Sequence, residues 1–479
     1  MLQNKDIAKI QEIKNLFQES WVNQEFFKTQ LNMFKCSKSS KIFQAVKKGG
    51  IPFWDIMKLL FILPFANTKN INSLFNSKFT PETSGQKDIY YRALANQKIN
   101  WRNLLLLFVK RYLHLDTKFT QTDSPKCLIF DDTEIEKTGK TIEGVSKIHS
   151  HVIQRYIFGY KLLLAGYWNG SIFIPLDFSL HRENKKNKIK KYGLSVKQRK
   201  NQKKTNRDSK QPVYKRFKEL NSKKNDIIVQ MFKRINQRKI DVDYILMDSW
   251  FTTMTLISKL LKVNNRVNII GMYKYNSRLT VDGQEIKIKQ LRKRTKKMKR
   301  SRSAKLHYIA TVCEIDEIKV KVFLTRKGRN GAWHTIVSTN TNLSFNQMIE
   351  IYNIRWTIEV FFKEAKQLLG LGKSQSTNFD VQIAQTTITM IQYLLISLKY
   401  RAEAYETIGG LFKEIKQDYI EHKLNQRILV VIVEILTVLD LLIENIDIHE
   451  TICKLIYYSD TFALLKNEEN NPTMHKSAA

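Results

Sequence analysis

The sequence is poor in residues that interrupt regular secondary structure, with only 17 glycines and 7 prolines among 479 residues. Its four cysteines, at positions 36, 127, 313 and 453, form no C-x-x-C pair and have no histidine partner at zinc spacing. This pattern argues against a zinc site or a disulfide framework and is typical of a reduced, cytosolic protein. The most apolar stretch, 428–442, is too short to span a bilayer and contains acidic residues. We therefore expect neither secretion nor membrane insertion.

Negative charge is also scarce. The chain has 81 Lys and Arg against 44 Asp and Glu, a formal net charge of +37. Solubility does not require such an excess, so it indicates a polyanionic partner. A coding bias toward lysine would add lysines without clustering them, yet the runs 185–207 and 287–305 each hold eleven Lys and Arg and no acidic residue.

The patterns divide the chain into regions. Helical segments with short breaks fill residues 1–120, and a short helix after Ser84-Gly85 would suit DNA docking, although a plain helical bundle is equally consistent. That short helix would carry Lys87, Tyr90, Tyr91 and Arg92. We expect a helical, DNA-binding region at 1–120, the first part of an α/β core at 121–270, a β-rich insertion at 271–342, a long helix and the end of the core at 343–400, and a helical C-terminal region at 401–479.

Strand signals begin at residue 126. KCLIF (126–130) is a short apolar run, and two further apolar runs flank Asn169-Gly170, the strongest short-range signal of a hairpin. A helix at 226–239, a buried strand DYILM (243–247), another helix and a strand at 266–270 follow. This order of elements is that of the ribonuclease-H fold, with parallel pairing of the later strands.

Two aspartates come directly after buried strands. Asp131 follows the first strand and Asp248 follows DYILM, and adjacent parallel strands would bring such residues together at one edge of a sheet. Asp132 competes with Asp131, because neighbours on a strand point to opposite faces and only one can serve the site. Aspartates after strands are more often turn residues, so these two positions indicate an active site only if a third functional residue accompanies them.

The third element is a long helix predicted over 344–370. It opens on a capping box of Ser344 and Gln347 and ends near Gly370. At the edge of its buried face, helical spacing aligns four side chains: Tyr352, Arg355, Glu359 and Lys366. By spacing alone, an exposed Arg–Glu pair worth about 0.3–0.5 kcal/mol explains them as well.

The segment YNIRWTIEVFFKEAK (352–366) resembles the Y-R-E-K signature of DDE transposases of the insertion-sequence-4 group. FDDTEIEKTGK (130–140) is similar to the first-aspartate segment of these enzymes and favours Asp131, followed by Thr133, over Asp132. DYILMDSWF (243–251) is similar to their second-aspartate segment. The resemblance covers roughly residues 125–380 and is weaker toward both ends.

This resemblance implies a ribonuclease-H-like catalytic core interrupted by a β-rich insertion, with helical N- and C-terminal regions. It implies a bacterial enzyme of the cytoplasm and nucleoid that cleaves the ends of an insertion sequence and transfers the 3′-hydroxyl strand into target DNA, as a homodimer. Asp131, Asp248 and Glu359 would be catalytic and would bind two Mg²⁺, with Mn²⁺ as a substitute. The same signature implies DNA contacts by Tyr352, Arg355 and Lys366.

The second basic run falls inside the expected insertion. With few apolar residues it cannot pack as a core segment, so we expect a flexible cationic segment over the DNA-cutting site or, alternatively, only a solvated loop. The residues expected to bind DNA there are Arg292, Lys293, Arg294, Lys296 and Lys297.

Other functions fit the sequence less well. A structure-specific nuclease on the same fold would not need the Y-R-E-K spacing, and a non-catalytic DNA-binding derivative would not need all three carboxylates. Asp131-Asp132-Thr133 lacks the spacing of a HAD-type phosphatase. His149-x-His151 has no third ligand and is more simply structural.

Overall fold

The computed structural model describes residues 50–66, 70–76, 85–116, 123–150, 152–183, 191–281, 283–294, 298–328, 330–402, 407–417 and 420. Every helix and strand discussed below belongs to one compact unit, formed by residues 30–64 and 68–412. Most of the predicted C-terminal region and residues 1–49 lie outside the described residues.

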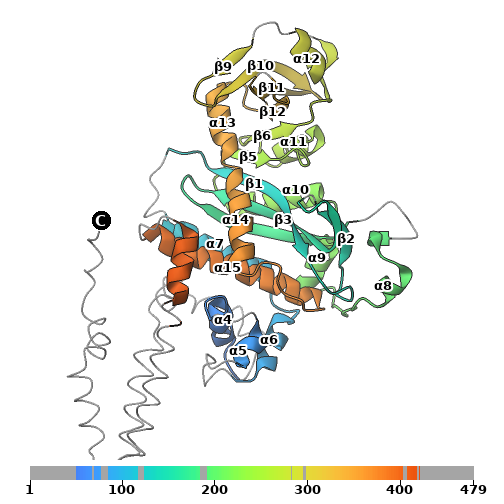
Figure 1. Ribbon diagram of the computed structural model, residues 1–479, viewed down its shortest axis with the longest axis vertical. Coiled ribbons are helices and arrows are strands. Elements are labelled where there is room, and N and C mark those ends of the chain that lie inside the picture. The colour runs from blue at the N-terminus through green and yellow to red at the C-terminus, as the bar shows by residue number, and fades with distance from the viewer. Residues whose placement is uncertain are drawn as a thin grey trace, which may run out of the picture. The chain divides into compact units, whose positions relative to one another are not determined.

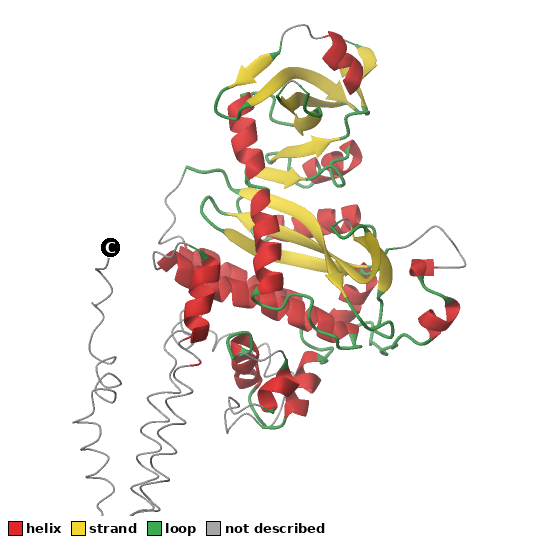
Figure 2. Ribbon diagram, in the orientation of Figure 1, coloured by secondary structure: helices red, strands yellow, loops and turns green. Residues whose placement is uncertain are grey.

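A mixed sheet of 12 strands organises this unit (Figures 1 and 2). Its main path runs β2-β3-β1-β5-β6-β12-β11-β10-β7-β8, with β4 paired to β3 and β9 paired to β10. The pairs β1–β5 and β5–β6 are parallel, and the other pairs are antiparallel. The predicted mixed α/β class is confirmed. The strands are β1 (Cys127–Glu136), β2 (Ser146–Ser150), β3 (Arg155–Trp168), β4 (Phe173–His181), β5 (Tyr244–Met247), β6 (Asn268–Tyr273), β7 (Arg278–Val281), β8 (Gln284–Lys287), β9 (Lys299–Ser301), β10 (Leu306–Ile315), β11 (Ile318–Lys327) and β12 (His334–Ser338).

The predicted hairpin at Asn169-Gly170 joins β3 to β4. Asn169 Oδ1 accepts hydrogen bonds from the backbone N–H groups of Ser171 and Ile172, at 3.0 and 2.9 Å. Gly170 has φ 103°, a backbone conformation that favours glycine. The turn is therefore fixed by the two residues that predict it. Every residue of β4 is buried, because α7, α9, α10 and α15 all contact this strand.

Helices enclose the sheet. They are α4 (Phe53–Ile62), α5 (Ile71–Phe75), α6 (Lys87–Leu94), α7 (Trp101–Asp116), α8 (Val196–Lys200), α9 (Pro212–Glu219), α10 (Lys224–Gln237), α11 (Met254–Leu261), α12 (Ile288–Arg294), α13 (Phe345–Asn353), α14 (Trp356–Gln367) and α15 (Phe379–Ala402). α15 packs against α4, α6, α7 and α9. Residues 379–398 of α15 are long and apolar enough to cross a membrane, but 94% of the apolar window is buried inside the protein. This is how the core helix of a globular fold behaves.

The predicted helix at 344–370 is wrong in one respect, since the structure divides it into α13 and α14. The capping box of Ser344 and Gln347 at its start is present. At the junction, the backbone N–H groups of Thr357 and Ile358 donate to carbonyls three residues earlier, at 3.0 and 3.2 Å. The Thr357 hydroxyl also donates to the Ile354 carbonyl, at 2.8 Å. Competition from this threonine side chain tightens the turn and interrupts the regular helix.

The sheet contains more than the sequence predicted. The sequence patterns did not predict β2, because SKIHS is short and four of its five residues are polar, which gives a weak strand signal. Residues 274–333 contain β7 to β11 and α12, and β12 then pairs with β6. The strands of this segment consequently continue the central sheet.

Candidate functional site

Asp131 and Asp248 lie at the same level of neighbouring strands. β1 and β5 are parallel, and their last paired residues are Phe130 and Met247. Each aspartate is the next residue along its strand direction. Asp131 lies within β1, which continues to Glu136, and not past the end of the strand as the sequence predicted. The strand continues because its antiparallel pairing with β3 extends to Gly159.

Asp131 and Asp132 point to opposite faces of the sheet. Asp131 accepts a hydrogen bond from Arg355, at the start of α14, whereas Asp132 pairs with Lys224, at the start of α10. Figure 1 shows α14 crossing in front of the strands. Glu359 lies on α14, so Asp131 shares its face of the sheet.

Arg355 links two of the three candidate carboxylates. Its Nη1 donates to Asp131 Oδ2 at 2.9 Å, and its Nη2 donates to Glu359 Oε1 at 2.7 Å. The Arg355 side chain is 13% exposed, so solvent screens these ion pairs only in part. The i,i+4 Arg–Glu pair that spacing predicted is present, but only its Glu359 side chain, 37% exposed, faces solvent. Its Nε is also buried, without a hydrogen-bond partner among the described residues.

Asp131 and Asp248 are close enough for the negative charge of one to affect the pKa of the other. The pKa of Asp131 is raised to about 7, mainly by burial and also by the charge of nearby Asp248, against the opposing effect of Arg355. Burial also raises the pKa of Asp248, although its carboxylate accepts hydrogen bonds from the backbone N–H groups of Trp250 and Phe251, at 3.0 and 3.2 Å. Crowded buried carboxylates raise one another's pKa because neither favours ionisation beside the other. A bound cation would relieve this repulsion.

The donor atoms suit a hard divalent cation, which prefers carboxylate oxygen. Among the described residues, however, no three His, Cys, Asp or Glu side chains are grouped closely enough to hold a metal ion. The guanidinium of Arg355 bridges Asp131 and Glu359 in this conformation. The residue set therefore fits a metal chemically, and an ion held by both Asp131 and Glu359 would have to displace Arg355 from these two carboxylates.

The other residues of the 352–366 motif are partly or fully buried. The Tyr352 side chain lies in the core, and its hydroxyl donates to the Met247 carbonyl at 3.2 Å, which holds α13 against β5. Lys366 Nζ donates to Thr133 Oγ1 at 2.7 Å, and burial lowers the pKa of this lysine. Thr133 is two residues beyond Asp131 and therefore on the same face of β1. Arg355 and Lys366, from the beginning and the end of α14, therefore contact Asp131 and Thr133 on one face of β1.

The basic run at 287–305 is more ordered than the sequence predicted. Residues 288–294 form α12, which is anchored by the buried side chains of Ile288 and Leu291, and residues 299–301 form β9. Apolar residues three positions apart on α12 account for this difference. Lys293 and Arg294 are exposed, and Arg292 lies over the Trp333 ring at 5.6 Å. Lys296 and Lys297 lie outside the described residues.

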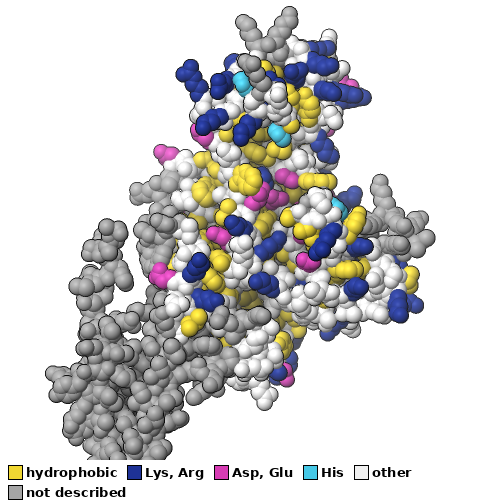
Figure 3. All heavy atoms as spheres, in the orientation of Figure 1, with side chains coloured by type: hydrophobic (Ala, Val, Ile, Leu, Met, Phe, Trp, Pro, Cys, Tyr) yellow, Lys and Arg dark blue, Asp and Glu magenta, His cyan; other side chains and the backbone are white. Residues whose placement is uncertain are grey.

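Figure 3 shows Lys and Arg side chains gathered over the part of this face formed by β9 to β12 and α12. Large apolar side chains are exposed nearer the carboxylates, and the sequence patterns did not single them out. Trp250 is 72% exposed, Trp356 is 59% exposed and Val360 is 50% exposed. Trp250 is two residues from Asp248, and Trp356 is adjacent to Arg355 in sequence. Only this closeness in sequence to candidate site residues could have indicated that the two tryptophans lie near the site.

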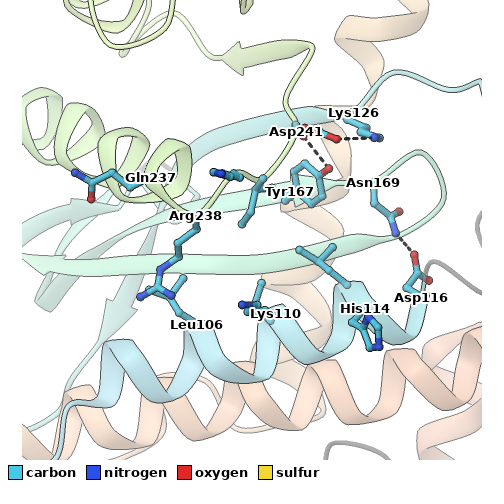
Figure 4. Close-up of a pocket in the computed structure, with 14 residues that line it drawn as sticks. Leu106, Lys110, His114, Asp116, Lys126, Tyr167, Asn169, Gln237, Arg238 and Asp241 are labelled. Atoms are coloured by element: carbon cyan, nitrogen blue, oxygen red, sulfur yellow. Dashed lines mark hydrogen bonds and ion pairs between the residues drawn. The ribbon is translucent and has the colours of Figure 1, made fainter.

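Two other features lie apart from the carboxylates. His149 packs edge-on against Tyr156 at 5.1 Å, while His151 lies outside the described residues. A cavity of about 680 Å³ lies between α7, the β3–β4 turn and the end of α10 (Figure 4). The Tyr167 hydroxyl at its wall donates to the Asp241 carbonyl at 2.9 Å. None of the three candidate carboxylates lines this cavity.

The site as a whole is an acidic centre on a mixed α/β sheet, bridged by one arginine and flanked by basic elements. Residues 122–395, more than half of the chain, match the protein family described as Transposase DDE domain. The chain belongs to this family of transposases. No curated protein matches its sequence.

Proposed function

We propose that this chain is the transposase of a bacterial insertion sequence, which cuts DNA at the ends of the element and joins the freed 3′-hydroxyl to target DNA. The supporting observation is the placement of Asp131 and Asp248 at one level of adjacent parallel strands, with Glu359 linked to Asp131 through Arg355. The strand order β4-β3-β1-β5-β6, antiparallel and then parallel, supports a ribonuclease-H-like core.

Asp131, Asp248 and Glu359 are the proposed ligands of two Mg²⁺ or Mn²⁺ ions, which would activate the attacking oxygen and stabilise the leaving oxygen. In the cutting step, water attacks phosphorus and the bond to the 3′-oxygen breaks, leaving a 3′-hydroxyl and a 5′-phosphate. In the joining step, this 3′-hydroxyl attacks a target phosphodiester, and the target's own 3′-oxygen leaves. Asp131 must be ionised to act as a ligand, so a proton, which burial of this carboxyl favours, competes with the metal for it.

The cationic residues of the motif are the proposed DNA contacts. Arg355 has a buried Nε without a partner among the described residues, so a phosphate oxygen could satisfy it as the guanidinium leaves the carboxylates. Lys366 holds a second positive charge on the same face. Tyr352 contributes mainly by holding α13 in place, since its hydroxyl already donates to Met247. The exposed Trp356 ring offers a surface on which an unpaired base can stack.

The basic residues of the insertion would add contacts that do not depend on base sequence. Arg292, Lys293 and Arg294 on α12, with Lys296 and Lys297 after it, are proposed to bind phosphates. Two element ends must be processed together, so the proposed active complex is a homodimer, and its proposed location is the bacterial cytoplasm at the nucleoid.

The test uses the full chain with a duplex that contains the element's own terminal sequence and flanking DNA. Cleavage should require Mg²⁺ or Mn²⁺ and should be lost in Asp248→Asn and Glu359→Gln, which retain size and shape. Glu350→Gln, at an exposed position on α13, is the matched control and should cut normally. Cleavage without joining would favour the structure-specific nuclease, and binding without cleavage would favour the non-catalytic DNA-binding protein.

A further inference from the structure

Residues 191–207, the basic arm, project from the sheet between β4 and α9. They include the short 3₁₀ helix Lys191–Gly193 and α8, which Figure 1 shows at the right of the view. The arm contains no acidic residue. Its basic residues are Lys191, Lys197, Arg199, Lys200, Lys203, Lys204 and Arg207.

The arm is fixed to the body of the protein. Leu194 is fully buried, and a capping box between Ser195 and Gln198 starts α8. Further along, Gln202 Nε2 donates to the Val145 carbonyl at 2.8 Å, and the Lys203 backbone N–H donates to the Thr141 carbonyl at 2.8 Å. Side-chain and backbone bonds on both sides of α8 therefore hold the arm in one position.

A buried ionic cluster secures the far end of the arm. Arg207 Nη1 donates to Glu143 Oε1 at 2.9 Å, and its Nε donates to Asp380 Oδ1 at 2.7 Å. Glu143 also accepts a 2.8 Å hydrogen bond from the Thr205 backbone. These two carboxylates neutralise Arg207, so this arginine serves the fold. It is not available to a partner.

The remaining lysines of α8 and the following turn behave differently. Lys197, Lys200, Lys203 and Lys204 are exposed, and none of them forms an ion pair with another described residue. Four like charges held together on a fixed element repel one another unless an anion lies against them. A merely solvated loop would lack such hydrogen bonds, whereas this backbone is bonded to the body of the protein on both sides of α8.

The basic arm and α12 contact strands at opposite ends of the sheet that contains Asp131 and Asp248. The 3₁₀ helix of the arm contacts β2, the strand at one end of the sheet path. α12 contacts β8, the strand at the other end. β1 and β5, which carry Asp131 and Asp248, lie between them. The two cationic elements therefore flank the acidic centre from opposite ends of one sheet.

We propose that the basic arm binds the phosphate backbone of duplex DNA on the side of the cut opposite to the side held by the insertion. The proposal rests on the proposed function, since it assumes that DNA is cut at the carboxylates. A duplex crossing the centre would meet positive charge before and after the scissile phosphate. The arm would position DNA without reading its sequence, because phosphate contacts carry no direct sequence information.

The first test replaces Lys197, Lys200, Lys203 and Lys204 with Gln in the full chain and measures duplex binding by fluorescence anisotropy across a salt series. Each phosphate that is no longer neutralised lowers the slope of log affinity against log salt by about 0.9, so the release of two to four phosphates flattens it by about 1.8 to 3.6. The matched control replaces four exposed residues, which are Lys233 on α10, Lys239 just after α10, and Lys262 and Arg266 after α11. Its slope should remain close to that of the parent.

The second test uses duplexes shortened at the cleavage position from one side or the other. The arm variant should bind one of the two shortened duplexes as well as the parent does, and the other at least tenfold more weakly near 0.1 M salt. The variant Arg292→Gln, Lys293→Gln, Arg294→Gln should show the opposite preference. Equal loss on both duplexes would overturn the proposal.

Further outcomes separate this proposal from the proposed function. If the parent cuts end DNA but the arm variant keeps the parental salt slope, the arm proposal alone fails. It also fails if the control variant loses as much binding, or if the arm variant loses binding to structured RNA and keeps binding to duplex DNA. If the parent neither binds nor cuts DNA, both proposals fail. Matching thermal unfolding curves would establish that the variants are folded.

Discussion

Arg355 donates a 2.9 Å hydrogen bond to Asp131, a residue 224 positions earlier in the chain. The same guanidinium donates at 2.7 Å to Glu359, one helical turn along α14. One positive charge thus neutralises parts of two carboxylates that, by the proposed mechanism, bind metal. Arginine and metal are consequently competitors for the same oxygens.

Arg355→Ala is expected to increase Mn²⁺ affinity in the absence of DNA by about tenfold, which corresponds to roughly 1.4 kcal/mol of removed competition for the carboxylates. Titration of Mn²⁺ followed by electron paramagnetic resonance measures this directly. The titration should be made at pH 8.5, because removing Arg355 raises the pKa of Asp131 above its present value of about 7. Lys366→Ala, which leaves the carboxylates untouched, is the control. Unchanged or weaker Mn²⁺ binding by the Arg355 variant would contradict the competition.

Asp131→Asn should abolish cleavage, whereas Asp132→Asn should reduce it less. The reason is geometric, since Asp131 shares a face with Glu359 and Asp132 pairs with Lys224 on the other face. Single-turnover cleavage of end DNA compares the two variants. The reverse order would assign the catalytic role to Asp132.

Lys137 provides a pH test of the fold. Its side chain is buried and donates to the carbonyls of Gly372 and Ser374, both at 2.6 Å, and burial lowers its pKa to about 7. The unfolded chain, with a normal lysine pKa near 10.5, binds the proton more tightly than the folded chain between these values. Stability from this residue is therefore lost as pH falls toward 7 and gained as pH rises, by up to about 1.4 kcal/mol per pH unit.

The measurement compares the parent with Lys137→Met by denaturant unfolding at pH 7, 8 and 9. The difference in unfolding free energy should shift in favour of the parent as pH rises. A difference that is constant across this range would mean that Lys137 stays protonated in the folded protein.

Replacing Arg292, Lys293, Arg294, Lys296 and Lys297 with Gln should weaken binding to end DNA and unrelated DNA alike. The salt dependence should become shallower by about 0.9 for each phosphate that these side chains neutralise in the parent. Competition between the two DNAs across a salt series tests both statements. Selective loss for end DNA would indicate that these residues read bases.

Local signals predicted the elements that they determine directly. Asn169 forms the hairpin turn with its own side chain, and Ser344 with Gln347 forms the cap at the start of α13. The apolar run before Asp248 is β5, as predicted. Each of these features depends on residues within a few positions of one another, so a sequence pattern contains the necessary information.

Features that depend on distant partners were not predictable. The strand pattern alone could not choose between Asp131 and Asp132, because only the packing of α14 and α10 distinguishes the two sheet faces. DNA contact by Tyr352 stays a prediction, and residue spacing gave no sign that its hydroxyl donates to a carbonyl of β5, 105 positions earlier. The break before α14 depends on a single threonine hydroxyl whose orientation no periodicity reveals. These contacts are tertiary, and residue spacing within one segment does not encode them.

The pairing of Tyr273 with Thr335 joins the end of β6 to the start of β12. β6 and β12 are antiparallel neighbours in the sheet, and strands in that arrangement can be joined by a turn of two residues. Residues 274–333, which connect these two strands, therefore form a cassette, that is, a segment that can be replaced as a unit. Evolution could lengthen, shorten or replace this cassette without reordering the strands that carry the acids. A protein engineer could exchange it for another module and keep the strands that hold Asp131 and Asp248 side by side.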